Sequence, residues 1–269
     1  MQPLLRVENL AKHYAAGRSA PSKDKIAALD GVSLSIPART TLALVGESGS
    51  GKSTLALCIA CLEHATSGSI WFEGIDVAAL DKNQQRLLRP QIQLVFQDPA
   101  SSLNPRWTAL EIVSEPFFVQ GRFSKQERSD KAGTWLDRVG ISRKMVSQRA
   151  DELSGGQKQR LAIARALALE PKLIILDEAL SALDCSVQAQ ISNLLLELQS
   201  SLGLTYLFIT HDFAMAAQLA DEIAVMDHGR IVESGPAEKI LSSPGHGATR
   251  SLLAATPRVP KTHSVLVNY

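Results

Sequence analysis

Gly46-Glu47-Ser48-Gly49-Ser50-Gly51-Lys52-Ser53 is the stretch of sequence that decides the fold class. It follows a short apolar run, Leu42–Val45, and precedes a run with helical spacing, which is the context that the pattern G-x-x-x-x-G-K-[ST] requires. The glycines let backbone N–H groups point at anionic oxygens, and the following helix adds its partial positive charge. A flexible Gly/Ser turn that happens to precede a lysine is the alternative, and it leaves the flanking strand and helix without a reason. We therefore expect a loop that binds the phosphates of a nucleoside triphosphate.

The side chains at the end of this loop have separate expected roles. Lys52 is expected to reach the β- and γ-phosphates, and the Ser53 hydroxyl is expected to bind Mg²⁺. Thr54, the next residue, completes the set of loop residues that we assign to the nucleotide.

Two later strands end in side chains that suit phosphate hydrolysis. Leu173–Leu176 is followed by Asp177 and Glu178, and ligands in open α/β sheets lie at the carboxyl ends of strands. Asp177 is expected to hold Mg²⁺ through water, and Glu178 to orient and deprotonate an attacking water. His211 follows another apolar run and is a candidate donor to the γ-phosphate. The alternatives are a strand that ends in solvent on charged residues and a histidine that serves only the surface or the core.

Short apolar runs alternate with longer helical patterns along the chain, which is typical of an α/β fold with a largely parallel sheet. Four nearly continuous apolar runs predict buried strands: Leu42–Val45, Gln93–Phe96, Leu173–Leu176 and Thr205–Thr210. Other segments predict a small antiparallel sheet and a hairpin: Leu4–Glu8, Val32–Ile36, Ser69–Phe72, and Ile223–Met226 with Arg230–Glu233.

Between Pro99 and about Ala168 the pattern is helical, with breaks expected at Pro105, Pro116 and Gly121. Three further stretches are predicted as an exposed loop, a helix packed on the sheet and a tail without clear pattern: 17–25, 212–220 and the residues after 257.

The composition excludes several classes of protein. The chain has 269 residues, 45% of them hydrophobic and 20% charged, which excludes disordered, collagen-like and coiled-coil proteins. The net charge of +1 provides no field that attracts nucleic acid, and no apolar run approaches the ~20 residues of a membrane helix. Three cysteines without an export signal predict reduced thiols in the cytosol. The pair Cys58-x-x-Cys61 could suggest a metal or redox site, but it has no second ligand pair and is more simply explained as core.

Leu153-Ser154-Gly155-Gly156-Gln157 decides the superfamily. Together with the motifs above, it resembles the signature of the ATPase subunit of ATP-binding-cassette (ABC) transporters, and the resemblance covers residues 4–257. The resemblance implies that Tyr14 stacks on adenine and that Gln97 contacts Mg²⁺ and senses the membrane partner. It implies that four residues face the ATP of the opposite subunit: Ser154, Gly155, Gly156 and Gln157. It also implies that Ser181 to Asp184 form the D-loop and that His211 is the switch histidine. Two ATP molecules would then lie in a head-to-tail dimer.

The resemblance also implies a fold and a division of the chain. The expected fold is a P-loop NTPase (RecA-like) core with a small antiparallel β-subdomain and a helical insert. The core and β-subdomain would take 4–98 and 166–240, the helical subdomain 99–165, and a short C-terminal tail 241–269.

Two segments resemble the oligopeptide, dipeptide and nickel importer branch of the family: 97–106 and 243–257. The sequence departs from that branch at Gly247-Ala248, where Pro-Tyr is usual, and no cysteine follows Cys185, although many members carry a cysteine-bearing extension. Ala179-Leu180 replaces the commoner Pro-Thr, as in some subunits that pair with a different ATPase.

The function implied is an ATPase that drives import of peptides or a related small solute. It would work with a second ATPase subunit beneath two membrane permeases, fed by an extracytoplasmic binding protein, at the cytoplasmic face of the inner membrane. The docking surface would be the helical insert with the loop 97–107. Three alternatives remain open here: a soluble cassette ATPase of a non-transport assembly such as a phosphonate-degrading complex, nickel or metallophore uptake, and a regulatory ATP-binding subunit with little turnover. Intact Glu178 and His211 argue against the last of these.

Overall fold

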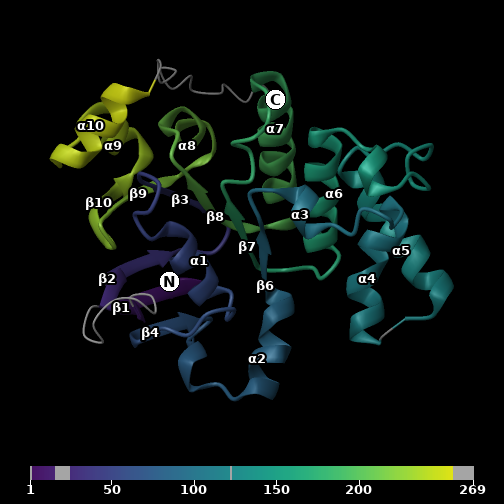
Figure 1. The fold of residues 1–269 in the computed structure, drawn as a ribbon, viewed down its shortest axis with the longest axis horizontal. Coiled ribbons are helices and arrows are strands. Elements are labelled where there is room, and N and C mark those ends of the chain that lie inside the picture. The colour runs from purple at the N-terminus through teal and green to yellow at the C-terminus, as the bar shows by residue number, and fades with distance from the viewer. Residues whose placement is uncertain (1, 16–24, 122, 257–269) are drawn as a thin grey trace. The chain divides into compact units, whose positions relative to one another are not determined.

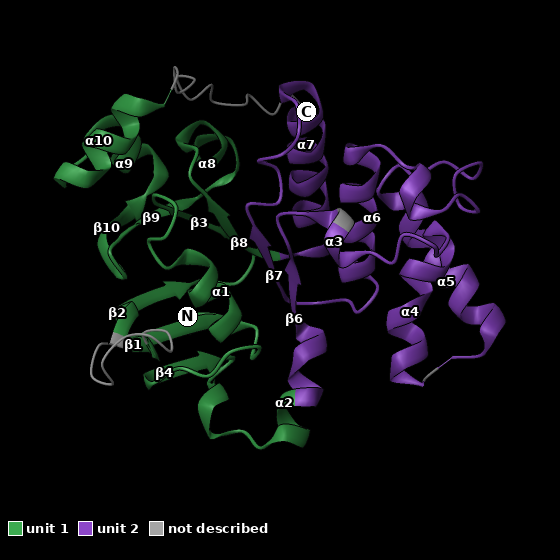
Figure 2. Ribbon diagram, in the orientation of Figure 1, with its two compact units in different colours: residues 1–85, 205–269 green, residues 86–204 purple. Residues whose placement is uncertain are grey.

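The computed structural model describes residues 2–15, 25–121 and 123–256 and divides the chain into two compact units. Unit 1 comprises Met1–Gln85 and Thr205–Tyr269, and unit 2 comprises Arg86–Leu204, as Figure 2 shows in two colours. The fold is α/β, with parallel and antiparallel strands.

The antiparallel sheet of unit 1 carries an apolar face at its centre. Leu5 lies opposite Ile36 on one neighbouring strand and opposite Phe72 on the other, and all three side chains are fully buried. This sheet confirms the predicted antiparallel strands and extends them toward the next loops. Its strands have the order β2, β1, β4, β5, with the bounds β1 (Leu5–Ala15), β2 (Lys25–Ile36), β4 (Ser67–Phe72) and β5 (Ile75–Asp76).

The other sheet of unit 1 has a central strand that is buried along its whole length. That strand, β3 (Thr41–Val45), runs parallel to both of its neighbours, so that Val45 lies opposite Thr210 and Val225. Continuous burial explains why Leu42–Val45 of this strand is an unbroken apolar run. The remaining strands, with the predicted hairpin at their end, are β8 (Thr205–Thr210), β9 (Glu222–Asp227) and β10 (Arg230–Pro236).

Helices complete unit 1, and Figure 1 labels its α-helices. The helix after the phosphate loop begins at Lys52. The helix predicted over 212–220 is capped by Asp212, whose carboxylate accepts a hydrogen bond from the Ala214 N–H. One helix, α10, forms within 241–269, the segment that the resemblance implied only as a short C-terminal tail, and α9 ends at the start of that segment. The bounds are α1 (Lys52–Ile59), η1 (Val77–Ala79), α8 (Phe213–Leu219), α9 (Ala237–Ser242) and α10 (Gly247–Ala255).

Unit 2 contains two parallel strands and the predicted run of helices. Val95 lies opposite Leu176, so the two strands end at the same level. The fourth helix packs against the fifth and the sixth. The bounds are β6 (Ile92–Val95), β7 (Leu173–Asp177), η2 (Arg89–Gln91), α3 (Pro99–Ser102), α4 (Ala109–Gln120), α5 (Lys125–Arg138), η3 (Ala150–Glu152), α6 (Gly155–Leu167) and α7 (Cys185–Leu202), while α2 (Lys82–Leu88) spans the boundary of the two units.

The expected break at Pro116 is wrong, because this proline lies inside α4. A proline in a helix interior removes one hydrogen bond and costs about 3 kcal/mol. Ile112, Val113 and Phe117 are buried on either side of Pro116, and their burial outweighs that loss. Gly121 does end the helix, with a left-handed φ of 66°.

The predicted loop and the predicted tail without clear pattern lie mostly or wholly outside the described residues. Most of the predicted loop 17–25 and all of the predicted tail after 257 lie outside them, but Lys25 belongs to β2. The predicted division at 98/99 and 165/166 differs from the boundaries of the compact units at 85/86 and 204/205, and it stays a prediction.

Candidate nucleotide-binding site

The phosphate loop of unit 1 connects β3 to the N-terminus of α1, as the sequence predicted. Lys52 is 4% exposed, and its ammonium donates to the carbonyl oxygens of Gly46 at 2.8 Å and Glu47 at 2.7 Å. The charge therefore lies within the loop. Among the residues that the structure describes, no side chain caps this end of α1, so the partial positive charge of the helix terminus is directed at the space that the loop encloses.

Two of the loop glycines are required by the backbone that surrounds them. A Cβ on Gly46 would lie 2.3 Å from the Met226 carbonyl oxygen, and one on Gly51 would lie 2.3 Å from the Ala28 carbonyl oxygen. Gly51 also has a φ of 108°, which L-residues with side chains rarely adopt. The loop is thus enclosed by neighbouring backbone, and any larger residue at these positions would deform it.

The hairpin between β9 and β10 contacts the phosphate loop. The sequence did not predict this contact. The Gly229 N–H donates to the Ser50 carbonyl oxygen at 2.9 Å, across 179 positions of sequence. No local pattern could reveal a contact that only the strand order creates. Within the described residues, the buried Ser50 hydroxyl oxygen has no hydrogen-bond partner, so it is a polar atom with capacity left for a phosphate oxygen.

His211 lies at the same sheet edge as the phosphate loop. It is exposed and directly follows Thr210, which is opposite Val45, the last residue before the loop. The carboxyl ends of two neighbouring parallel strands thus bring the histidine and the loop to one edge of the sheet of unit 1, the position at which α/β proteins bind ligands.

Tyr14, the predicted adenine contact, lies near the end of β1, and its side chain is 37% exposed. An exposed ring on a strand of unit 1 is available for stacking. Cys58 lies in α1, where burial raises the pKa of its thiol to about 11, so it behaves as a packed core residue.

In unit 2, Gln97 and Glu178 are brought into contact. The Gln97 amide Nε2 donates to Glu178 Oε2 at 3.2 Å and lies 3.5 Å from the Ser181 hydroxyl. The Ser181 hydroxyl in turn donates to the Glu178 carbonyl oxygen at 2.9 Å. Asp177, the last residue of β7, is 9% exposed. The predicted base therefore has a fixed carboxylate, held at its side chain by the glutamine and at its backbone by the serine.

The signature stretch forms the N-terminus of α6. Ser154 and Gln157 make a reciprocal capping box: the Ser154 N–H donates to Gln157 Oε1 at 2.8 Å, and the Gln157 N–H donates to the Ser154 hydroxyl oxygen at 3.4 Å. Gly156 is needed for close packing, because a Cβ there would lie 2.6 Å from Val187 Cγ1 of α7. Ser154 and Gly155 are exposed, so this helix terminus points at solvent.

Asp184 has a structural role that the resemblance did not imply. Its carboxylate accepts from the Val187 N–H at 3.0 Å and caps α7. The cap fixes the D-loop beside the start of α6, where a Cβ on Gly155 would lie 3.5 Å from the Leu183 side chain.

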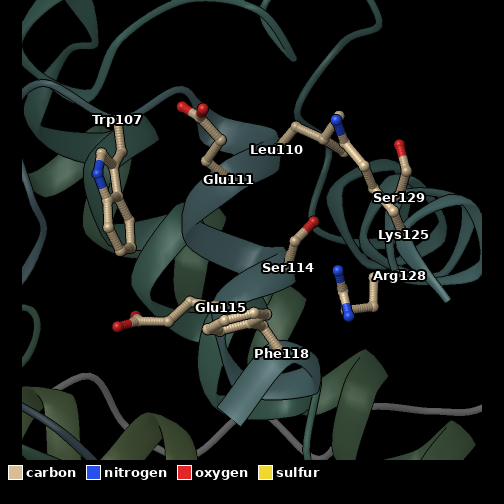
Figure 3. A pocket seen from close by; sticks show the side chains of 9 residues that line it. All are labelled: Trp107, Leu110, Glu111, Ser114, Glu115, Phe118, Lys125, Arg128 and Ser129. Atoms are coloured by element: carbon tan, nitrogen blue, oxygen red, sulfur yellow. The ribbon is translucent and has the colours of Figure 1, made fainter. Parts of the chain in front are cut away.

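A separate groove of about 450 Å³ lies between α4 and α5 of unit 2. Figure 3 shows Phe118 at one end of the groove and Arg128 facing Ser114 across it. Phe118 is 66% exposed, and the Arg128 guanidinium carbon lies 5.2 Å from its ring centroid. Acidic side chains line the groove from α4 and basic ones from α5: Glu111 and Glu115, and Lys125 and Arg128.

Comparisons with known proteins identify the family to which the phosphate loop and the signature stretch point. The family model described as "ABC transporter" matches residues 29–181. A protein of Sinorhizobium fredii named "Probable peptide ABC transporter ATP-binding protein" is 49% identical over 94% of this chain and 72% of its own length. The dipeptide transport ATP-binding protein DppF of Escherichia coli is 45% identical over 96% of this chain and 78% of its own length.

A solved structure supports the same comparison at the level of the fold. An ATP-binding cassette, solved as a dimer in a post-hydrolysis state with ADP and phosphate bound, has a TM-score of 0.78 and 33% identity, covering 87% of this chain and 98% of that one.

Proposed function

We propose that this chain, which belongs to the ABC transporter family and is therefore an ATPase, is the ATP-hydrolysing subunit of an importer of small peptides. The names of the relatives support the peptide cargo. The observation that carries the ATPase part is the enclosed phosphate loop with its buried Lys52, in a chain that also fixes a carboxylate at Glu178.

The proposed reaction is transfer of the γ-phosphoryl group of ATP to water. Lys52 neutralises negative charge on the β- and γ-phosphates, and His211 donates to the γ-phosphate. Glu178 takes the proton of the attacking water as the water oxygen bonds to phosphorus and the bond to the β–γ bridging oxygen breaks. The products are ADP and inorganic phosphate.

Ser53, Gln97 and Asp177 are the residues that would hold Mg²⁺. Their hydroxyl, amide and carboxylate oxygens are the ligands that this hard cation prefers. The ion would neutralise charge on the β- and γ-phosphates. Tyr14 would stack on the adenine ring.

ABC ATPases dimerise and work with membrane permeases, and among the described residues no helix is long and apolar enough to cross a membrane. We assign this chain to the cytoplasmic face of the inner membrane, held there by two permease subunits and paired with a second ATPase subunit. An extracytoplasmic binding protein would supply the peptide.

The uptake of a radiolabelled dipeptide by cells that lack this chain tests the proposal. The wild-type chain is expected to restore uptake, and the Glu178→Gln variant is expected not to. Uptake of labelled nickel in place of dipeptide would replace the peptide cargo with the metal. Loss of the chain without any effect on solute uptake would favour a non-transport ATPase.

We assign the groove between α4 and α5 to docking of a short permease helix. Three exposed apolar side chains lie at or near it: Trp107, Phe118 and Val119, at 37%, 66% and 64% exposure. Acidic residues on one wall and basic residues on the other suit an amphipathic helix with an apolar side chain at its centre.

The Phe118→Asp variant is expected to lose co-purification with the permeases while the isolated chain keeps its ATPase activity. Leu87→Asp is the matched control, because Leu87 is 73% exposed and does not line the groove. Retention of the permeases by Phe118→Asp would remove the groove from the interface.

A further inference from the structure

Lys12 of β1 makes a set of contacts that the roles assigned above do not use. Its ammonium Nζ donates to Glu63 Oε1 at 2.6 Å and to the His64 carbonyl oxygen at 2.7 Å. The same nitrogen lies 4.9 Å from the centroid of the Tyr14 ring. The Lys12 ammonium therefore contacts both the Tyr14 ring, the predicted adenine contact, and a segment about 50 residues further along the chain.

The charge at this position is well defined. The Lys12 side chain is 12% exposed, and the hydrogen bond to Glu63 raises the pKa of the ammonium above its ordinary value. An ammonium group has three donors, of which Glu63 and His64 take two. The remaining attraction is to the face of the Tyr14 ring, which the π electrons make negative.

Glu63 is in turn attached to the end of α1. The N–H groups of Leu62 and Glu63 both donate to the Leu57 carbonyl oxygen, at 2.9 and 3.2 Å. Glu63 lies just beyond α1, which begins at Lys52 and ends at Ile59, so the acceptor that holds Lys12 is hydrogen-bonded to the helix that follows the phosphate loop. The ring and the loop are thereby linked within unit 1 by a short series of contacts.

We propose that Lys12 is a positioning residue for nucleotide binding, which holds the Tyr14 ring at a fixed distance from the phosphate loop and places positive charge on one of its faces. The opposite face then stacks on the base. This inference rests on the proposed function, which assigns Tyr14 to adenine. A ring polarised by a cation is a better partner for the electron-rich adenine ring, and a fixed ring loses less conformational entropy on binding.

The alternative is that Lys12 only stabilises the fold. The chain offers a matched comparison, because Arg6 on the same strand lies 5.3 Å from the centroid of the Trp71 ring and so makes the same kind of contact away from Tyr14. A purely structural cation–π pair should behave like Arg6 in a nucleotide-binding experiment.

The experiment is titration calorimetry on the full chain with two ligands, each with Mg²⁺: β,γ-imido-ATP, which has a base, and inorganic tripolyphosphate, which has none. Lys12→Met is expected to weaken binding of the ATP analogue roughly 3- to 30-fold, the range that a partly desolvated cation–π contact supports. Binding of tripolyphosphate should be unchanged, and Arg6→Met should alter neither affinity.

A double-mutant cycle identifies the route of the effect. In a Tyr14→Ala background, Lys12→Met should cause no further loss, because the ring through which it acts is gone. Glu63→Gln keeps the size of the acceptor and weakens its hold on Lys12, so it should give a smaller loss for the ATP analogue only. This variant serves if Lys12→Met fails to fold, as judged by its thermal unfolding.

Three results would overturn the inference alone: equal weakening for tripolyphosphate, the same loss with and without Tyr14, or no change for Lys12→Met and Glu63→Gln. A wild-type chain that bound neither ligand would overturn the proposed function and this inference with it.

Discussion

Glu178 combines an unusual backbone conformation with two hydrogen bonds that hold it in place. Its φ is 46°, in the left-handed region, where a residue with a long side chain is strained by about 1–3 kcal/mol. The Ser181 hydroxyl binds its carbonyl oxygen and the Gln97 amide binds its carboxylate. Strain that is maintained by such contacts is typical of residues whose orientation matters for function.

Glu178→Gln should slow hydrolysis by ~10²–10⁴-fold and leave ATP binding intact, because only the ability to accept a proton is lost. The glutamine has the same size and can still accept from Gln97, so the strained turn should persist. Phosphate release and ATP affinity, measured on the same preparation, separate the two effects. Unchanged turnover would remove Glu178 from the mechanism.

Unlike Glu178→Gln, Lys52→Ala should impair ATP binding itself. The affinity for ATP should fall by at least about 10²-fold, since the substitution removes several charge-assisted hydrogen bonds from the loop. It also removes the donor to the Gly46 and Glu47 carbonyl oxygens. Calorimetric titration with ATP is the measurement, and the exposed Lys82→Ala is the control. A near-normal affinity for Lys52→Ala would show that the loop is not the phosphate site.

At the scale of elements, capping boxes mark where three helices of unit 2 begin, α4, α5 and α6. The Thr108 hydroxyl oxygen accepts from the Glu111 N–H at 3.2 Å, and the Glu111 carboxylate accepts from the Thr108 N–H at 2.8 Å. The hydrogen bonds that the Glu111 carboxylate accepts from the Thr108 N–H and from the Thr108 hydroxyl lower the pKa of Glu111 below its usual 4.5. Because the folded-state pKa is the lower one, this stabilisation is present above pH 4.5 and is lost as the pH falls through the folded-state value.

Thr108→Ala should therefore lower the free energy of unfolding at pH 7 by about 1 kcal/mol. Glu111→Gln should differ from the wild type in stability at pH 7, and the difference should shrink as the pH falls below 4.5. Urea unfolding between pH 3 and 7 measures both effects. A difference for Glu111→Gln that stays constant over this range would contradict the role of the ionised carboxylate.

The sequence predicted the elements with strong periodicity and the motifs with fixed spacing. The strands before the phosphate loop and before Asp177 are confirmed, because buried parallel strands have continuous apolar runs. The helix through Pro116 could not be predicted, since burial by distant elements overrides the local preference. Nor could α10, whose start is held by a distant carboxylate: Glu233 of β10 accepts from the Gly245 and His246 N–H groups.

At the scale of the whole molecule, the exposed start of α6 is predicted to act on a second ATPase subunit. Ser154 and Gly155 are exposed. A helix N-terminus with small residues is a good anion site, so an anion from outside the chain can reach these residues. A family member has been solved as a dimer with ADP and phosphate bound. We expect the start of α6 to serve the nucleotide held by the second ATPase subunit, so its loss should be felt by the partner and not by the chain that carries it.

Ser154→Asp tests this without disturbing the helix, because aspartate is as good an N-cap as serine and can accept from the Gln157 N–H in the same way. It places a negative charge where a phosphate is expected. The isolated monomer should bind ATP with wild-type affinity, since its own phosphate loop is untouched, whereas ATP-driven dimerisation and hydrolysis should fail. Ser154→Asn, a neutral cap, should retain more of both. Gel filtration with ATP measures dimerisation, and calorimetry measures binding. A Ser154→Asp monomer with impaired ATP binding would place Ser154 at its own nucleotide and contradict the assignment to the partner.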